Sequence, residues 1–140
     1  VYIHGYETEF QYKLNKLIDL EGSFSATRGE NLTDNSPLYY VPPDKILLST
    51  EVYLSPFSIN LMHKKVFSQN RVGLYEETTP GYGTYNLIGT YTIRSTQAIH
   101  KFILQIDNIF DRKYYNHLSR IKSIMPEKGR NIGFQYRLNF

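Results

Sequence analysis

The carboxylates and histidines of this chain do not form a catalytic set. Glu7 and Glu9 are two residues apart, so both lie on one face of an extended strand, where paired carboxylates can serve as acid and base. No nucleophile accompanies them in a pattern that would complete such a site. We therefore interpret both glutamates as part of a strand wall, and we expect a protein that is not an enzyme.

The sequence also does not predict a metal site or a phosphate-binding site. The four histidines are isolated, without a partner at the spacing of metal ligands: His4, His63, His100 and His117. The chain has no cysteine, which excludes disulfides and thiolate metal sites. The glycines of "GYGTYNLIG" do not join a strand to a helix, as a phosphate-binding loop requires. We expect no resident metal and no cofactor.

The composition limits the partners. The net charge of the 140 residues is only +3, and the 16 basic residues are spread among 13 acidic ones, so the sequence does not predict a nucleic-acid binder. No apolar run approaches the roughly 18 residues of a membrane helix, and no signal peptide is visible. The chain is therefore either soluble or crosses a membrane as strands. It opens with Val1 in the middle of a pattern, and we expect it to be a piece of a longer chain.

Alternation of apolar and polar side chains dominates the sequence and predicts an all-β fold. In the final segment, apolar residues occupy every second position: Ile132, Phe134, Tyr136, Leu138 and Phe140. The alternating segments are 6–14, 18–27, 46–54, 58–67, 85–93, 101–110 and 131–140. We interpret them as antiparallel strands that run up and down in chain order.

The connections between these segments alternate in length. Three are tight, at 15–16, 55–57 and 94–97. Three are long, polar and rich in Gly, Pro and Asn, at 29–44, 69–81 and 110–128. A meander of this kind places all its long loops at one end of the sheet.

Alternation alone leaves two classes of β protein open. In a soluble sandwich or barrel that binds a small apolar ligand, the apolar row faces inward; in an outer-membrane barrel it faces lipid. Aromatic residues near the strand ends favour the membrane class, because such rings prefer the membrane interfaces. They are Tyr39, Tyr40, Phe67, Tyr82, Tyr85, Tyr114 and Tyr115 toward the long loops, and Tyr53, Phe57, Tyr91, Phe102 and Phe140 toward the tight turns.

The last part of the chain resembles the C-terminal end of TonB-dependent outer-membrane receptors. The matching elements are Asn108-Ile109-Phe110-Asp111, Lys113-Tyr114-Tyr115, Gly129-Arg130-Asn131 and the terminal Phe140. Earlier stretches, "PLYYVPPDKILLSTEVYL" and "TPGYGTYNLIGTYTI", are similar to strand entries of that family. Lys128 before Gly129 is a departure from the family pattern.

This resemblance implies a transmembrane β-barrel of about 22 strands closed by a plug domain, of which this chain supplies about seven strands. The plug and the earlier strands lie outside the chain. The implied function is active transport of a ferric siderophore or similar metal chelate across the bacterial outer membrane. The implied partners are outer-membrane lipid, the TonB energy-coupling complex and the barrel assembly machinery. That machinery reads a C-terminal signal, here Tyr136, Leu138 and Phe140.

In this family the extracellular loops help to line the ligand pocket, so loop residues that suit an anionic aromatic chelate are candidates. Cations pair with its charge and rings stack on it. The candidates are Tyr39, Tyr40, Arg71, Tyr75, His117 and Arg120. The simpler interpretation is that these residues make loop–loop contacts, and that His117 is a solvated loop histidine. A passive porin and a barrel-bound enzyme also remain open.

Overall fold

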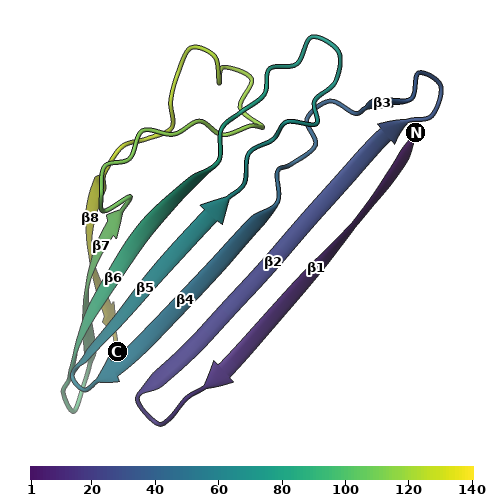
Figure 1. Cartoon of the computed structure of the whole chain (residues 1–140). Helices are drawn as coiled ribbons and strands as arrows, with labels where there is room; N and C mark the ends of the chain where they lie inside the picture. The colour runs from purple at the N-terminus through teal and green to yellow at the C-terminus, as the bar shows by residue number, and fades with distance from the viewer.

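The computed structural model describes residues 1–140 and contains only strands, turns and loops (Figure 1). The strands are β1 (Tyr2–Lys13), β2 (Ile18–Asn31), β3 (Ser36–Pro37), β4 (Lys45–Leu54), β5 (Phe57–Val66), β6 (Tyr82–Arg94), β7 (Ile99–Asp107) and β8 (Asn131–Asn139). It contains no helix of the length and hydrophobicity needed to cross a bilayer.

All the strands belong to one antiparallel sheet in the order β1-β2-β4-β5-β6-β7-β8, with the two-residue β3 paired to β2. Each long strand therefore pairs with the next one along the chain. The prediction of an all-β, up-and-down antiparallel fold is confirmed. The sheet is curved and open, with β1 and β8 at its two edges (Figure 1).

The two kinds of connection lie at opposite ends of the sheet, as predicted (Figure 1). Residues 14–17, 55–56 and 95–98 form the tight turns. Residues 32–44, 67–81 and 108–130 form the long loops, and β3 lies within the first of them. The predicted strand 101–110 is three residues too long, because Asn108 adopts φ 49° and begins a corner.

The register places the predicted apolar rows on one side of the sheet. Opposite pairs include Phe10 and Gly22, Leu61 and Leu87, and Leu104 and Phe134. We call this side the apolar face. The other side, the polar face, carries the residues between them, among them Glu9, Glu21, Asn60, Lys101 and Arg137.

Nothing in the chain covers the apolar face. Leu104 is 45% exposed and Phe134 is 69% exposed. Soluble monomers rarely expose continuous apolar patches of more than a few hundred Å². The soluble alternative expected this row to be buried, and the residues of this chain do not bury it.

Aromatic rings form a row across the apolar face near the tight turns. Phe57 stacks on Tyr91 at 4.7 Å between ring centroids, and Phe102 lies 5.1 Å from Tyr136. Such cross-strand aromatic pairs stabilise a sheet. Tyr53, by contrast, lies opposite Ser58 on the polar face, so its assignment to this row is wrong.

The long-loop end of the sheet contains most of the buried residues, whereas the apolar face is exposed. Only 11 of the 140 residues are buried. Most of them lie in the long loops or at the adjoining strand ends, as Gln69, Thr79, Tyr82 and His117 do. Tyr82 was predicted for the aromatic belt, but it lies buried opposite Val66, on the polar face. The protein therefore has its interior among the loops.

Candidate functional site

The residues that resemble the receptor family form a hydrogen-bond network at the base of the loop 108–130. The Asn108 side chain donates to the carbonyl of Arg112 at 2.9 Å and accepts from the same residue's N–H. Asp111 accepts from the N–H of Arg130 at 2.7 Å, and a Cβ at Gly129 would lie 2.6 Å from the same carboxylate oxygen. The two halves of the motif thus meet, and Gly129 leaves room for Asp111.

Further along the same loop end, the buried carboxylate of Glu76 contacts residues of all three long loops. Glu76 accepts hydrogen bonds from the N–H of Gly73 at 3.1 Å and from the N–H of Tyr40 at 3.2 Å. Its Oε1 lies 3.1 Å from Nε2 of His117 and 3.6 Å from Nζ of Lys122. The Glu76, His117 and Lys122 side chains are 5%, 1% and 9% exposed. We call these three residues and Thr79 the Glu76 cluster.

The contacts of His117 fix its tautomer. Its Nδ1 lies 2.9 Å from the Thr79 hydroxyl and 3.2 Å from Nζ of Lys122. An ammonium group only donates, so Nδ1 must accept and the ring proton of a neutral His117 is on Nε2. That Nε2 proton lies on the side of the ring that faces Glu76. The contact between Nε2 and Oε1 of Glu76 does not meet the criteria for a hydrogen bond. A neutral His117 between Lys122 and Glu76 leaves one positive and one negative charge buried together.

Both titratable loop groups favour this charge state. Burial lowers the pKa of His117, Lys122 lowers it further, and the opposing effect of Glu76 is smaller. Burial alone would raise the pKa of Glu76, but the N–H donors of Gly73 and Tyr40, with His117 and Lys122, outweigh it and lower that pKa. The folded loops therefore hold Glu76 ionised and His117 neutral at neutral pH.

Two ion pairs tie the loops to the strands below. Arg28 and Asp44 form a bidentate pair, with the Nη2–Oδ2 distance at 2.7 Å, and Arg28 lowers the pKa of Asp44 through this hydrogen bond. Arg71 pairs with Glu30 at 2.7 Å. These contacts position the first two long loops over the end of β2.

Three of the predicted ligand residues take part in contacts that hold the loops to one another or to β2. Tyr40 donates its N–H to Glu76, and Arg71 pairs with Glu30. His117 is buried in the Glu76 cluster, so the interpretation of a solvated histidine is wrong. Burial by the surrounding loops leaves this ring little surface for a ligand to contact.

The other three candidates present surface to the outside. The Tyr39 ring lies against Gly73, where a Cβ would be 2.7 Å from the ring, and half of Tyr39 remains exposed. Tyr75 is 95% exposed and Arg120 is also exposed. Tyr75 adopts φ 68°, a left-handed conformation that is uncommon for a bulky residue and that accumulates at functional sites.

Glu76, Lys122 and Thr79 were not among the predicted site residues. No local pattern marks them, because their partners belong to loops far apart in the chain. Charged groups in a polar loop are usually solvated, so their types gave no signal either. The only available signal was that the three long loops had to converge at one end of the sheet.

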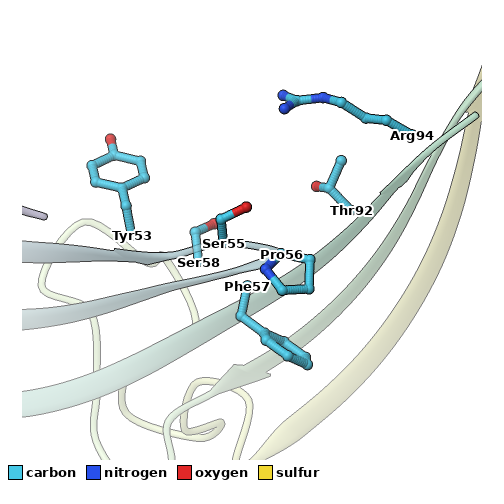
Figure 2. A pocket seen from close by; sticks show the side chains of 7 residues that line it. All are labelled: Tyr53, Ser55, Pro56, Phe57, Ser58, Thr92 and Arg94. Carbon is cyan, nitrogen blue, oxygen red and sulfur yellow. The ribbon is translucent and has the colours of Figure 1, made fainter.

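Neither of the two main hollows of the chain is lined by a predicted ligand residue. A hollow of about 380 Å³ lies at the tight-turn end, lined by Tyr53, Ser55, Pro56, Phe57, Ser58, Thr92 and Arg94. Figure 2 shows Tyr53, Thr92 and Arg94 on one side of the strands and Phe57 on the other. No group of three His, Asp or Glu side chains lies close enough to hold a metal ion.

Comparison with known proteins gives a match in structure. No family model matches the chain. The fold is similar to that of the copper transporter OprC, with a TM-score of 0.84 and 25% sequence identity over 97% of this chain. The match covers 22% of the transporter's chain, and 35 chains of solved structures match in all. This chain thus has the fold of a segment of a larger transporter structure.

Proposed function

We propose that this chain is the C-terminal part of the β-barrel of a TonB-dependent outer-membrane transporter that imports a metal chelate. The observation that carries the proposal is the two-faced sheet: an uncovered apolar face, a charged polar face, and long loops at one end only. The likeness to a copper transporter over 97% of the chain supports it.

The orientation of the sheet follows from solvation. In hydrocarbon every backbone group must be paired within the protein, which a closed barrel of strands achieves. The apolar face, with Leu104 and Phe134, then meets lipid, and the polar face, with Glu9 and Lys101, lines the enclosed interior. The open edges at β1 and β8 pair with strands outside this chain.

The long loops supply the outer ligand surface. Tyr39, Tyr75 and Arg120 are exposed there, and the Glu76 cluster holds the loops that carry them in fixed relative positions. Aromatic rings and a guanidinium suit a ligand that is both aromatic and negatively charged. A preorganised surface binds such a ligand at a lower cost in conformational entropy.

The cargo class is a metal bound to an organic chelator, with a ferric siderophore as the first candidate. The chemistry of the exposed loop residues favours a chelate over a bare cation, because Arg120 would repel a free metal ion. Copper complexes are the second candidate, because the structurally similar OprC is a copper transporter. The full-length transporter moves its cargo without altering it, and the TonB complex supplies the energy.

The test uses the full-length protein in cells that lack the chromosomal copy. Uptake of radiolabelled ferric siderophores and copper complexes should be saturable and should stop when the proton-motive force is dissipated. Uptake that persists without that energy source would identify a passive porin and overturn the proposal.

Loop variants test the ligand surface. Arg120→Gln and Tyr75→Ala should raise the half-saturating cargo concentration several-fold. Lys16→Gln removes another exposed charge, at the tight-turn end, and serves as the control. Equal effects of Arg120→Gln and Lys16→Gln would remove the loops from ligand binding.

A further inference from the structure

Three cations gather at the tight-turn end of the polar face without a partner. Lys101 of β7 lies directly opposite Arg137 of β8 and opposite Thr92 of β6, and Arg94 lies two residues further along the same face of β6. None of the three side chains takes part in any of the chain's ion pairs or side-chain hydrogen bonds. Like charges directly opposite each other on neighbouring strands destabilise a sheet.

No carboxylate of this chain forms an ion pair with these cations. The only acidic residue on the polar face of β6 to β8 is Asp107, at the far end of β7, where Gln105 donates to it at 2.9 Å. The hollow of about 380 Å³ lies beside one of these cations, since the side chains of Thr92 and Arg94 line it (Figure 2). The corner therefore combines unbalanced positive charge with space beside it.

The other half of the polar face is net negative, because five acidic residues outnumber Lys13 and Lys45 there. Asp19 of β2 lies directly opposite Glu51 of β4, a second like-charge pair without an ion-pair partner. The acidic residues on this half are Glu7, Glu9, Asp19, Glu21 and Glu51. An anionic partner is repelled by β1 to β4 and attracted by β6 to β8, so the charge pattern fixes where it can lie.

We propose that Arg94, Lys101 and Arg137 form a docking site for an acidic polypeptide segment inside the barrel. Adjacent strands are about 4.8 Å apart, so the three cations span about 10 Å, more than one carboxylate or phosphate covers. A segment with several Asp or Glu side chains matches that width. The proposal rests on the proposed function in one respect, namely that the polar face is enclosed.

Photo-crosslinking in the full-length protein tests this directly. A benzoyl-phenylalanine placed at Lys101 should crosslink to one polypeptide segment with an excess of Asp and Glu, identified by mass spectrometry. The matched control is the same group at Phe102, the next residue, which lies on the apolar face. A second pair, Arg94 and its neighbour Ile93, repeats the test if the first variants do not assemble.

Charge variants then test whether the crosslinked segment is held by the positive charges or merely lies near them. Adding Arg137→Glu to the Lys101 probe should lower the crosslink yield several-fold, whereas Arg137→Lys should preserve it. A crosslink to a neutral or basic segment, or none to protein, overturns the docking site. Lipid adducts at Lys101 with protein adducts at Phe102 would instead show that the faces are reversed and overturn the proposed function as well.

Discussion

The strands and the long loops are held in place by different forces. In the sheet, Leu104 and Phe134 lie opposite each other and stay largely exposed, and the register rests on backbone pairing with one apolar face left uncovered. In the loops, Glu76 and His117 are almost fully buried, and hydrogen bonds and charges replace an apolar core. The sheet thus has no apolar core of its own, whereas the loop end has a buried polar interior.

A charge on the apolar face should have the largest effect. Leu104→Arg places a guanidinium in hydrocarbon, at a cost of about 2–4 kcal/mol near the bilayer centre. We expect a strong loss of folded protein in the outer membrane, measured by heat-modifiable mobility on gels. Ile103→Arg, one residue away on the polar face, is the control and should assemble. Equal losses would show that the two faces do not differ.

Removing the central charge of the loops should have the next largest effect. Glu76→Gln keeps the shape but leaves Lys122 buried without its counter-ion, which costs about 1–3 kcal/mol. Amide hydrogen exchange in 67–81 and 108–130 should quicken by about tenfold or more, while exchange in β7 stays unchanged. Glu77→Gln changes an exposed neighbour and should have no effect. If both variants behave alike, Glu76 does not hold the loops together.

Acid should loosen the loops through the same residues. The pKa of His117 is lowered from 6.5 and that of Glu76 from 4.5, so the open loops bind protons more readily than the closed ones. The stabilisation is therefore complete above about pH 6.5 and is lost as the pH falls toward and below the lowered pKa values. A protonated His117 would also face Lys122 at 3.2 Å.

Hydrogen exchange at pH 7.5 and at pH 5, corrected for the intrinsic rates, measures this loss. His117→Gln should reduce the pH dependence, since only the Glu76 contribution remains. Loops that become more protected in acid would contradict the assigned charge state.

The smallest expected effect concerns glycines of the apolar face. The Phe10 ring packs over Gly22, and a Cβ there would collide with it, so Gly22→Ala should lower stability by about 1 kcal/mol. Gly89 lies on the same face with no atom within 4 Å of an added Cβ, so Gly89→Ala should be neutral. Thermal unfolding of the detergent-solubilised full-length protein compares them, and equal shifts would contradict the packing.

The sheet could be predicted from the sequence because a strand repeats every two residues. Ile132, Phe134 and their neighbours reveal both the strand and the face it shows. The corner at Asn108 could be predicted only from a family resemblance, since a left-handed Asn leaves no periodic pattern. The two-residue β3 could not be predicted either, because two residues are too few to show an alternating pattern.

The candidate site was predictable only in part. The convergence of the long loops followed from the meander, and exposed Tyr75 and Arg120 fit the expectation of a ligand surface without testing it. The burial of His117 was not foreseeable, because its partners Glu76 and Thr79 lie in another loop. Contacts between distant loops depend on three-dimensional placement that residue types alone do not encode.

The most direct test of the account is the environment of alternate residues along β7. This chain has no cysteine, so single cysteines at positions 100–107 of an otherwise cysteine-free full-length protein can each carry a spin label. In outer-membrane lipid, labels at His100, Phe102, Leu104 and Ile106 should collide with dissolved oxygen, and labels at the positions between them should not. Oxygen accessibility without alternation, or with the opposite phase, would contradict the claim that the apolar face meets lipid.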